Sequence, residues 1–153
     1  MYEHGMIAPV VALTIWSFFM LIWLYATRIP AMQQAKIDPE KLKDDPTAKE
    51  RLPVGPRRVA ANYAHLMEQP TVFYAVCFAL QFLAMEADAA VHPINIGLAW
   101  AYVALRVVHS LVQATVNVIM VRFLIFAVSS LVLGALIVHA AMASGLVQFS
   151  FSG

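Results

Sequence analysis

The fold is decided by residues 118–143, VIMVRFLIFAVSSLVLGALIVHAAMA, an apolar stretch in which Arg122 is the one charged residue. A helix needs about 20 mostly apolar residues to cross the hydrocarbon core of a bilayer. Other apolar stretches lie at about residues 7–27, 70–86 and 93–114. They are continuous rather than alternating, which favours helices over the strands of a β-barrel. The sequence therefore predicts an all-α integral membrane four-helix bundle with antiparallel spans.

The composition supports the same conclusion. Of 153 residues, 61% are hydrophobic and 12% are charged, whereas soluble domains have about 45–50% and about 25%. Lipid must therefore cover part of the apolar surface of what we expect to be one domain, residues 1–153. The net charge of +1 argues neither for nor against a nucleic-acid partner, but the sequence has no basic cluster with interleaved aromatic residues, so we expect none. We also expect no metal site, because no group of His, Cys and carboxylate residues has ligand spacing.

Positive charge is concentrated between the first two spans, in the loop and helix entrance at residues 28–69. This segment contains five prolines, four of them between residues 39 and 56, which predict irregular structure in its first part. We expect the helix of the second span to begin before Pro70. By the positive-inside rule the segment lies in the cytoplasm and both termini lie on the other side. It holds eight of the ten basic residues: Arg28, Lys36, Lys41, Lys43, Lys49, Arg51, Arg57 and Arg58.

Polar residues inside the third span are candidates for a site, since burying them in a membrane costs free energy. They recur every three or four residues and so share one face of a helix, with His109 at its edge. Two interpretations remain open: the stripe fixes helix packing through hydrogen bonds, or it lines a ligand site. An ion path is a third, for which the spans offer no carboxylate partner. The stripe consists of Tyr102, Arg106, Ser110, Gln113 and Asn117.

A second polar group precedes Pro70. On a continuous helix Arg58, Asn62, His65 and Gln69 would share one face with Glu68 beside it, at the cytoplasmic membrane surface. The arginines there could bind a carboxylate or the phosphates of lipids. Arg122, at the start of the fourth span, is either part of such a site or a snorkelling anchor. Cys77, the only cysteine, lies in an apolar run and is expected to be an inert buried thiol.

Together these features resemble the MAPEG family, the membrane-associated proteins in eicosanoid and glutathione metabolism, and in particular its bacterial members. The resemblance covers nearly the whole chain. Its most specific parts are the segment HLMEQP at residues 65–70 and the spacing of Arg106, His109 and Arg122.

The resemblance implies a homotrimer in a bacterial inner membrane, with glutathione bound between subunits near the cytoplasmic surface and a lipophilic small molecule arriving from the lipid bilayer. It implies that Arg122 stabilises the glutathione thiolate, which is the catalytic role. The implied activity is that of a glutathione S-transferase or peroxidase. The implied binding residues are Arg28, Arg58, Asn62 and Glu68, and the polar faces of the second and third spans add His65, Arg106 and Gln113 as candidate binding residues.

Two positions differ from many glutathione-using members. Three residues after Asn62, where they carry Glu, this chain has His65, and its carboxylate follows at Glu68. Seven residues after Arg106, where they carry Tyr, it has Gln113. A second reading is therefore a non-catalytic MAPEG-like protein that binds lipid or serves as an accessory subunit of a larger membrane complex.

Overall fold

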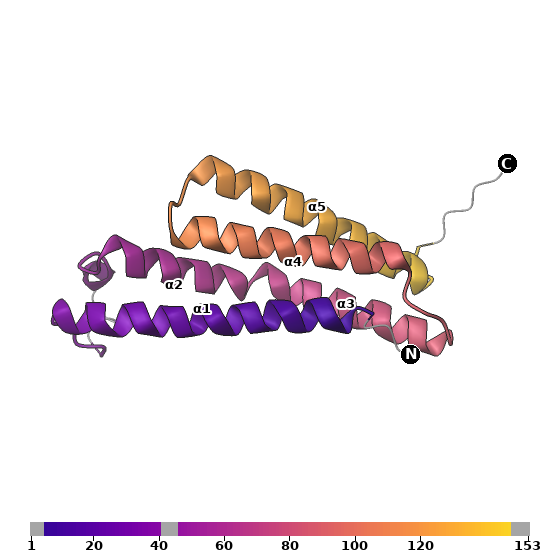
Figure 1. The fold of residues 1–153 in the computed structure, drawn as a ribbon, viewed down its shortest axis with the longest axis horizontal. Helices are drawn as coiled ribbons and strands as arrows, with labels where there is room; N and C mark the ends of the chain where they lie inside the picture. Colours follow the sequence, from indigo (N-terminus) through magenta and orange to yellow (C-terminus); the bar gives the residue numbers. More distant parts are fainter. Residues whose placement is uncertain (1–4, 41–45, 148–153) are drawn as a thin grey trace.

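The computed structural model describes residues 5–40 and 46–147, and every regular element in these ranges is helical (Figure 1). Lys41 and Lys43 of the basic segment lie outside the described residues. The elements are α1 (Ile7–Gln34), the short 3₁₀ helix η1 (Pro46–Lys49), α2 (Val54–Leu66), α3 (Gln69–Glu86), α4 (Pro93–Ala114) and α5 (Ile119–Ala143).

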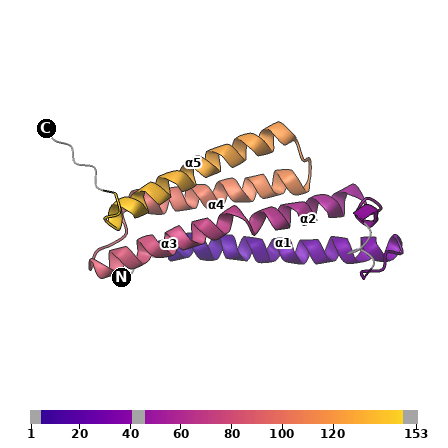
Figure 2. The ribbon, with the colours of Figure 1, turned by 180° about the vertical axis from the view of Figure 1, so that it is seen from behind.

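Four helical segments are long and apolar enough to cross a membrane: α1, α2 together with α3, α4 and α5. The expectation of an all-α, multi-pass integral membrane protein is thus confirmed. Figures 1 and 2 show the segments as rods lying side by side. The start of α1 and the end of α5 lie at one end of the bundle, and the turn between α4 and α5 lies toward the other.

The first span is longer than its apolar run suggests, because α1 continues past Thr27 and through Pro30 to Gln34. The second span is not one continuous helix. α2 ends at Leu66 and α3 begins at Gln69, with Glu68 between them at φ −91° and ψ −93°. Proline has no N–H, so Pro70 cannot donate to the Leu66 carbonyl, and its ring would clash with that carbonyl in an uninterrupted helix.

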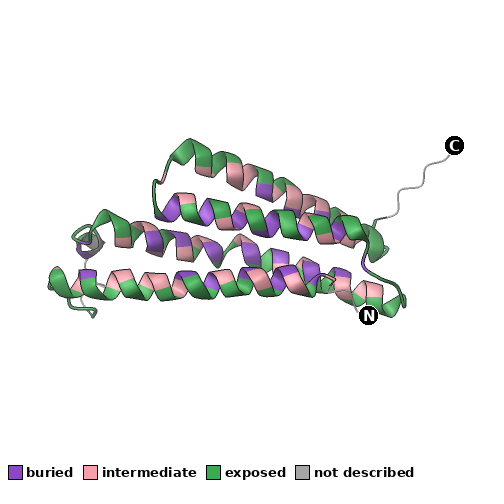
Figure 3. Ribbon diagram, viewed as in Figure 1, coloured by how far each residue is buried: buried purple, intermediate pink, exposed green. Residues whose placement is uncertain are grey.

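The largest core cluster forms where α1, α3, α4 and α5 meet. Phe73 of α3 stacks on Tyr102 of α4 with ring centroids 4.4 Å apart, and both side chains are fully buried. Large apolar side chains such as Phe18, Phe82 and Leu131 are instead exposed, and Figure 3 shows that exposed residues follow the outer faces of the helices. These faces are suited to contact with lipid chains, which are as apolar as the side chains themselves.

Truncation of Phe73 should destabilise the bundle. Lipid cannot fill the space left in the core, so Phe73→Ala is expected to lower the free energy of unfolding by about 3 kcal/mol. Phe78→Ala on the same helix removes an exposed ring and should cost less than about 1 kcal/mol. Unfolding of both purified variants in one detergent measures the difference, and equal losses would contradict this assignment of the core.

Candidate functional site

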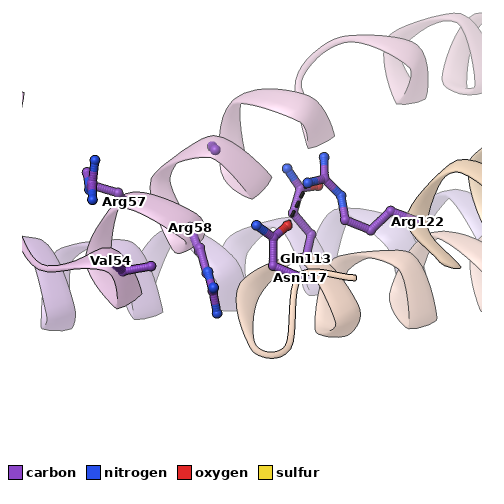
Figure 4. Close-up of a pocket in the computed structure, with 7 residues that line it drawn as sticks. Val54, Arg57, Arg58, Gln113, Asn117 and Arg122 are labelled. Atoms are coloured by element: carbon purple, nitrogen blue, oxygen red, sulfur yellow. Dashed lines mark hydrogen bonds between the residues drawn. The ribbon is translucent and has the colours of Figure 1, made fainter. Parts of the chain in front are cut away.

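A cavity of about 250 Å³ lies where α2, α4 and the start of α5 meet (Figure 4). Three of its lining side chains are guanidinium groups and none is a carboxylate, so the cavity favours an anion. In Figure 4 the side chains of Arg122, Gln113 and Asn117 lie together, and Arg57 stands apart from them at the start of α2. The lining residues are Val54, Arg57, Arg58, Ala61, Gln113, Asn117 and Arg122.

Two of the arginines are held by the turn between α4 and α5. Nη1 of Arg58 donates to the backbone carbonyl of Thr115 over 2.6 Å. Nη1 of Arg122 donates to Oδ1 of Asn117, also over 2.6 Å. Both distances are short for N–H···O bonds, as expected for charged donors. A side chain of α2 and a side chain of α5 are thereby held at one turn, which is remote in sequence from Arg58 and five residues before Arg122.

Gln113 places an amide in the wall of this cavity. Its side chain is 5% exposed, and its Oε1 accepts no hydrogen bond from the described residues. The Nε atoms of Arg58 and Arg122 are also buried and have no hydrogen-bond partner among the described residues. Unpaired buried polar atoms cost free energy, so a ligand that paired with them would be stabilised. The cavity suits an anion that also carries an N–H or O–H donor.

Arg106 lies deeper in the bundle and is 1% exposed. Its Nη2 donates to the backbone carbonyl of His65 over 3.2 Å, beside the break between α2 and α3. Its Nη1 lies 3.5 Å from Oε1 of Gln69, which also accepts from the Tyr102 hydroxyl over 3.2 Å. Gln69 in turn donates to Ser130 Oγ over 2.8 Å. The His65 carbonyl also accepts from the Glu68 N–H over 3.4 Å, so the guanidinium supplies a second donor at the end of α2, where its charge is favourable to the helix dipole.

The other polar residues of the second span lie along this buried network. Asn62 is buried and donates from Nδ2 to Ser110 Oγ over 2.6 Å. Nδ1 of His65 lies 3.1 Å from Oε2 of Glu68, whose side chain is 69% exposed. The His65 ring also packs 5.2 Å from the ring of His109. The contacts of Asn62 with Ser110 and of His65 with His109 connect α2 with α4.

The predicted site residues therefore divide into two groups. Arg58, Gln113 and Arg122 line the cavity. A second group belongs to the buried network or its edge: Asn62, His65, Glu68 and Arg106. Arg28 is partly buried on α1 and does not line the cavity. Within the described residues there is no group of three His, Cys, Asp or Glu side chains that could hold a metal.

The sequence analysis placed Asn117 in the polar stripe but did not name it among the binding residues. Its position just after α4, at the start of a turn with an arginine five residues later, was the available signal. The role of the Thr115 carbonyl has no signal in the sequence, because any residue supplies a carbonyl. Arg57 was recognised only as a possible anion ligand beside Arg58.

Comparison with known proteins gives one match. A family model described as the MAPEG family matches residues 6–142 of the chain. No curated protein and no solved structure matches it.

Replacement of Arg106 should weaken the junction between α2 and α3. Arg106→Met keeps a long apolar stem and leaves the His65 carbonyl with only the 3.4 Å bond from the Glu68 N–H, so we expect a loss of about 1–3 kcal/mol in stability. The matched change Arg57→Met, at an exposed residue of the cavity rim, should cost less than about 0.5 kcal/mol. Detergent unfolding measures both, and a stable Arg106→Met variant with unchanged amide exchange at the end of α2 would refute the role.

Proposed function

The chain belongs to the MAPEG family, whose members are mostly glutathione-dependent transferases and peroxidases, and on this basis we propose that it transfers glutathione to lipophilic electrophiles. The observation that carries the proposal is the cavity in which Arg58 and Arg122 converge beside the unpaired oxygen of Gln113. Glutathione offers the complementary groups: two carboxylates, N–H donors and a thiol.

Recognition of glutathione would divide among these side chains. Guanidinium groups bind carboxylates through charge-assisted hydrogen bonds, which Arg57 and Arg58 at the start of α2 are placed to make. Oε1 of Gln113 would accept from an N–H of the peptide. Arg122, from the other side of the cavity, would then lie beside the sulfur.

The chemistry follows from the charge of Arg122. A cation beside a thiol lowers the pKa of that thiol, and the thiolate is the nucleophile. The thiol proton passes to solvent, the sulfur attacks an electrophilic carbon, and the new C–S bond forms as the leaving group departs with its electron pair. An electrophile dissolved in the bilayer could approach between the helices, whose outer faces are apolar.

We further propose that the protein works as a homotrimer. Arg28 does not line the cavity of its own subunit, so the Arg28 that would complete a glutathione site belongs to a neighbouring copy. The exposed carboxylate of Glu68, in the middle of the second candidate span, supports such an assembly, since exposure of that group to lipid would be costly.

A second candidate function is the binding of lipid without catalysis. Three guanidinium groups without a carboxylate among the cavity residues would also suit the phosphate of an anionic lipid. Gln113, which replaces the Tyr of many glutathione-using members, favours this reading because an amide cannot act as a phenol does. In this case the protein could be an accessory subunit of a larger complex.

Removal of Arg122 should abolish most turnover. For Arg122→Ala we expect kcat/KM for glutathione conjugation to fall by about 10²–10³-fold, the effect of losing one preorganised charge partner. The matched change Lys36→Asn removes an exposed cation outside the cavity, at a residue with φ 50° that Asn tolerates, and should leave the rate unchanged. A wild-type protein that neither binds glutathione nor consumes it with a panel of electrophiles would refute the proposal, and stoichiometric co-purified anionic lipid would favour the second function.

The proposed orientation in the bacterial inner membrane can be tested with single cysteines. Glu40 and Ala89 are exposed and lie in connections after α1 and after α3. With the basic segment in the cytoplasm, a membrane-impermeant maleimide should label Ala89→Cys in spheroplasts and Glu40→Cys only after lysis. The native Cys77 is fully buried and should stay unlabelled in the parent protein. The reverse pattern would overturn the orientation.

A further inference from the structure

We infer that the turn between α4 and α5 is the positioning element of the cavity, and that Asn117 in this turn orients the guanidinium of Arg122 toward a bound anion. The turn comprises residues 115–118, between the last residue of α4 and the first of α5. Asn117 is a positioning residue here because it acts through Arg122 rather than on the reacting atoms. The part of the inference that concerns a thiolate rests on the proposed function.

The backbone of the turn is itself held in place by the end of α4. The N–H of Thr115 donates to the Leu111 carbonyl over 3.1 Å, and its hydroxyl donates to the same carbonyl over 2.6 Å. The N–H of Asn117 donates to the Val112 carbonyl over 2.7 Å. These bonds close the end of the helix and satisfy carbonyls that would otherwise be unpaired. The backbone of the turn is therefore tied by hydrogen bonds to the end of α4 and supports the side chains attached to it.

Both cavity arginines whose contacts are described use this support. Arg58 reaches the Thr115 carbonyl and Arg122 reaches the Asn117 amide, each over 2.6 Å. An arginine side chain has many rotamers, and fixing one of its nitrogen atoms removes most of that freedom before a ligand arrives. Preorganised charges stabilise a developing anion better than mobile ones, since they need no rearrangement during the reaction.

Position 117 needs a residue that tolerates a left-handed backbone and carries an uncharged hydrogen-bond acceptor, and asparagine meets both needs. Its φ of 55° lies in the left-handed region, which Asn tolerates better than most residues other than Gly. Its side-chain oxygen accepts from Arg122 without bringing a negative charge, so the guanidinium keeps its full charge for the ligand. Glycine would supply the backbone conformation but no acceptor, and aspartate would supply the acceptor but neutralise the cation.

This difference allows a test that separates orientation from folding. Asn117→Gly keeps the left-handed turn and removes the acceptor. Asp88→Gly is the matched control, because Asp88 also has a left-handed φ of 48° but lies in the connection between α3 and α4, away from the cavity. Asn117→Asp keeps the acceptor and adds a charge. Each variant is made in the full chain and purified in detergent.

The first readout uses no glutathione. Phenylglyoxal modifies accessible arginines, and mass mapping of the peptides reports the rate at Arg122. We expect faster modification of Arg122 in Asn117→Gly than in the wild type, and wild-type rates in Asp88→Gly and Asn117→Asp. Equal rates at Arg122 in Asn117→Gly and Asp88→Gly would overturn the inference.

The second readout is the ultraviolet absorbance of bound glutathione thiolate as pH is varied. In Asn117→Gly we expect the midpoint of thiolate formation to rise by about one pH unit, a roughly tenfold smaller thiolate fraction below the midpoint. Asp88→Gly should match the wild type, and Asn117→Asp should bind glutathione more weakly. An unchanged midpoint in Asn117→Gly would overturn the inference. If the wild type binds no glutathione, the proposed function fails, and the modification rates still decide the role of Asn117.

Discussion

The rest of this structure depends on one constraint, the need to pair backbone polar groups inside a bilayer, and the hydrogen bond from Arg106 to the His65 carbonyl helps to meet it. Within a bilayer no water is available for an unpaired backbone group, so a break in a spanning helix needs a donor or acceptor from elsewhere in the protein. Pro70 forces such a break between α2 and α3. A buried guanidinium on α4, with Gln69 and Tyr102 around it, adds a side-chain donor at this break, beside the 3.4 Å bond from the Glu68 N–H to the same His65 carbonyl.

The break lets the two halves of the second span pack differently. α3 joins the apolar core through Phe73 and Tyr102, whereas α2 contacts the end of α4 through polar bonds from Asn62 and Arg58. Polar residues on one face of α4 consequently have separate tasks. Those near the middle stabilise the bundle, and those near the end, Gln113 and the following Asn117, line a cavity. Arginines illustrate the same division, since Arg106 is paired within the bundle and Arg122 lies in the cavity wall.

The resemblance to the MAPEG family is confirmed by the family match over residues 6–142, and the structure refines what it implied about the site. Arg58 and Arg122 lie in one cavity of a single subunit, whereas Arg28 does not. His65 and Glu68 face each other at the helix break rather than in the cavity. We therefore propose that Arg58 and Arg122 bind the anion and that the buried Arg106 stabilises the bundle.

The sequence by itself determined the four spans and the all-α class, because bilayer thickness and the lack of water in lipid restrict both the length and the composition of a spanning segment. It also identified the polar side chains that interrupt the spans, since their rarity makes them conspicuous. Only the tertiary structure decided which of them share a cavity. The partner of Arg106 is a carbonyl at a helix break, and the partner of Arg58 is a carbonyl in the turn between α4 and α5. These two contacts join distant segments through backbone atoms, which residue types and spacing along one helix do not encode.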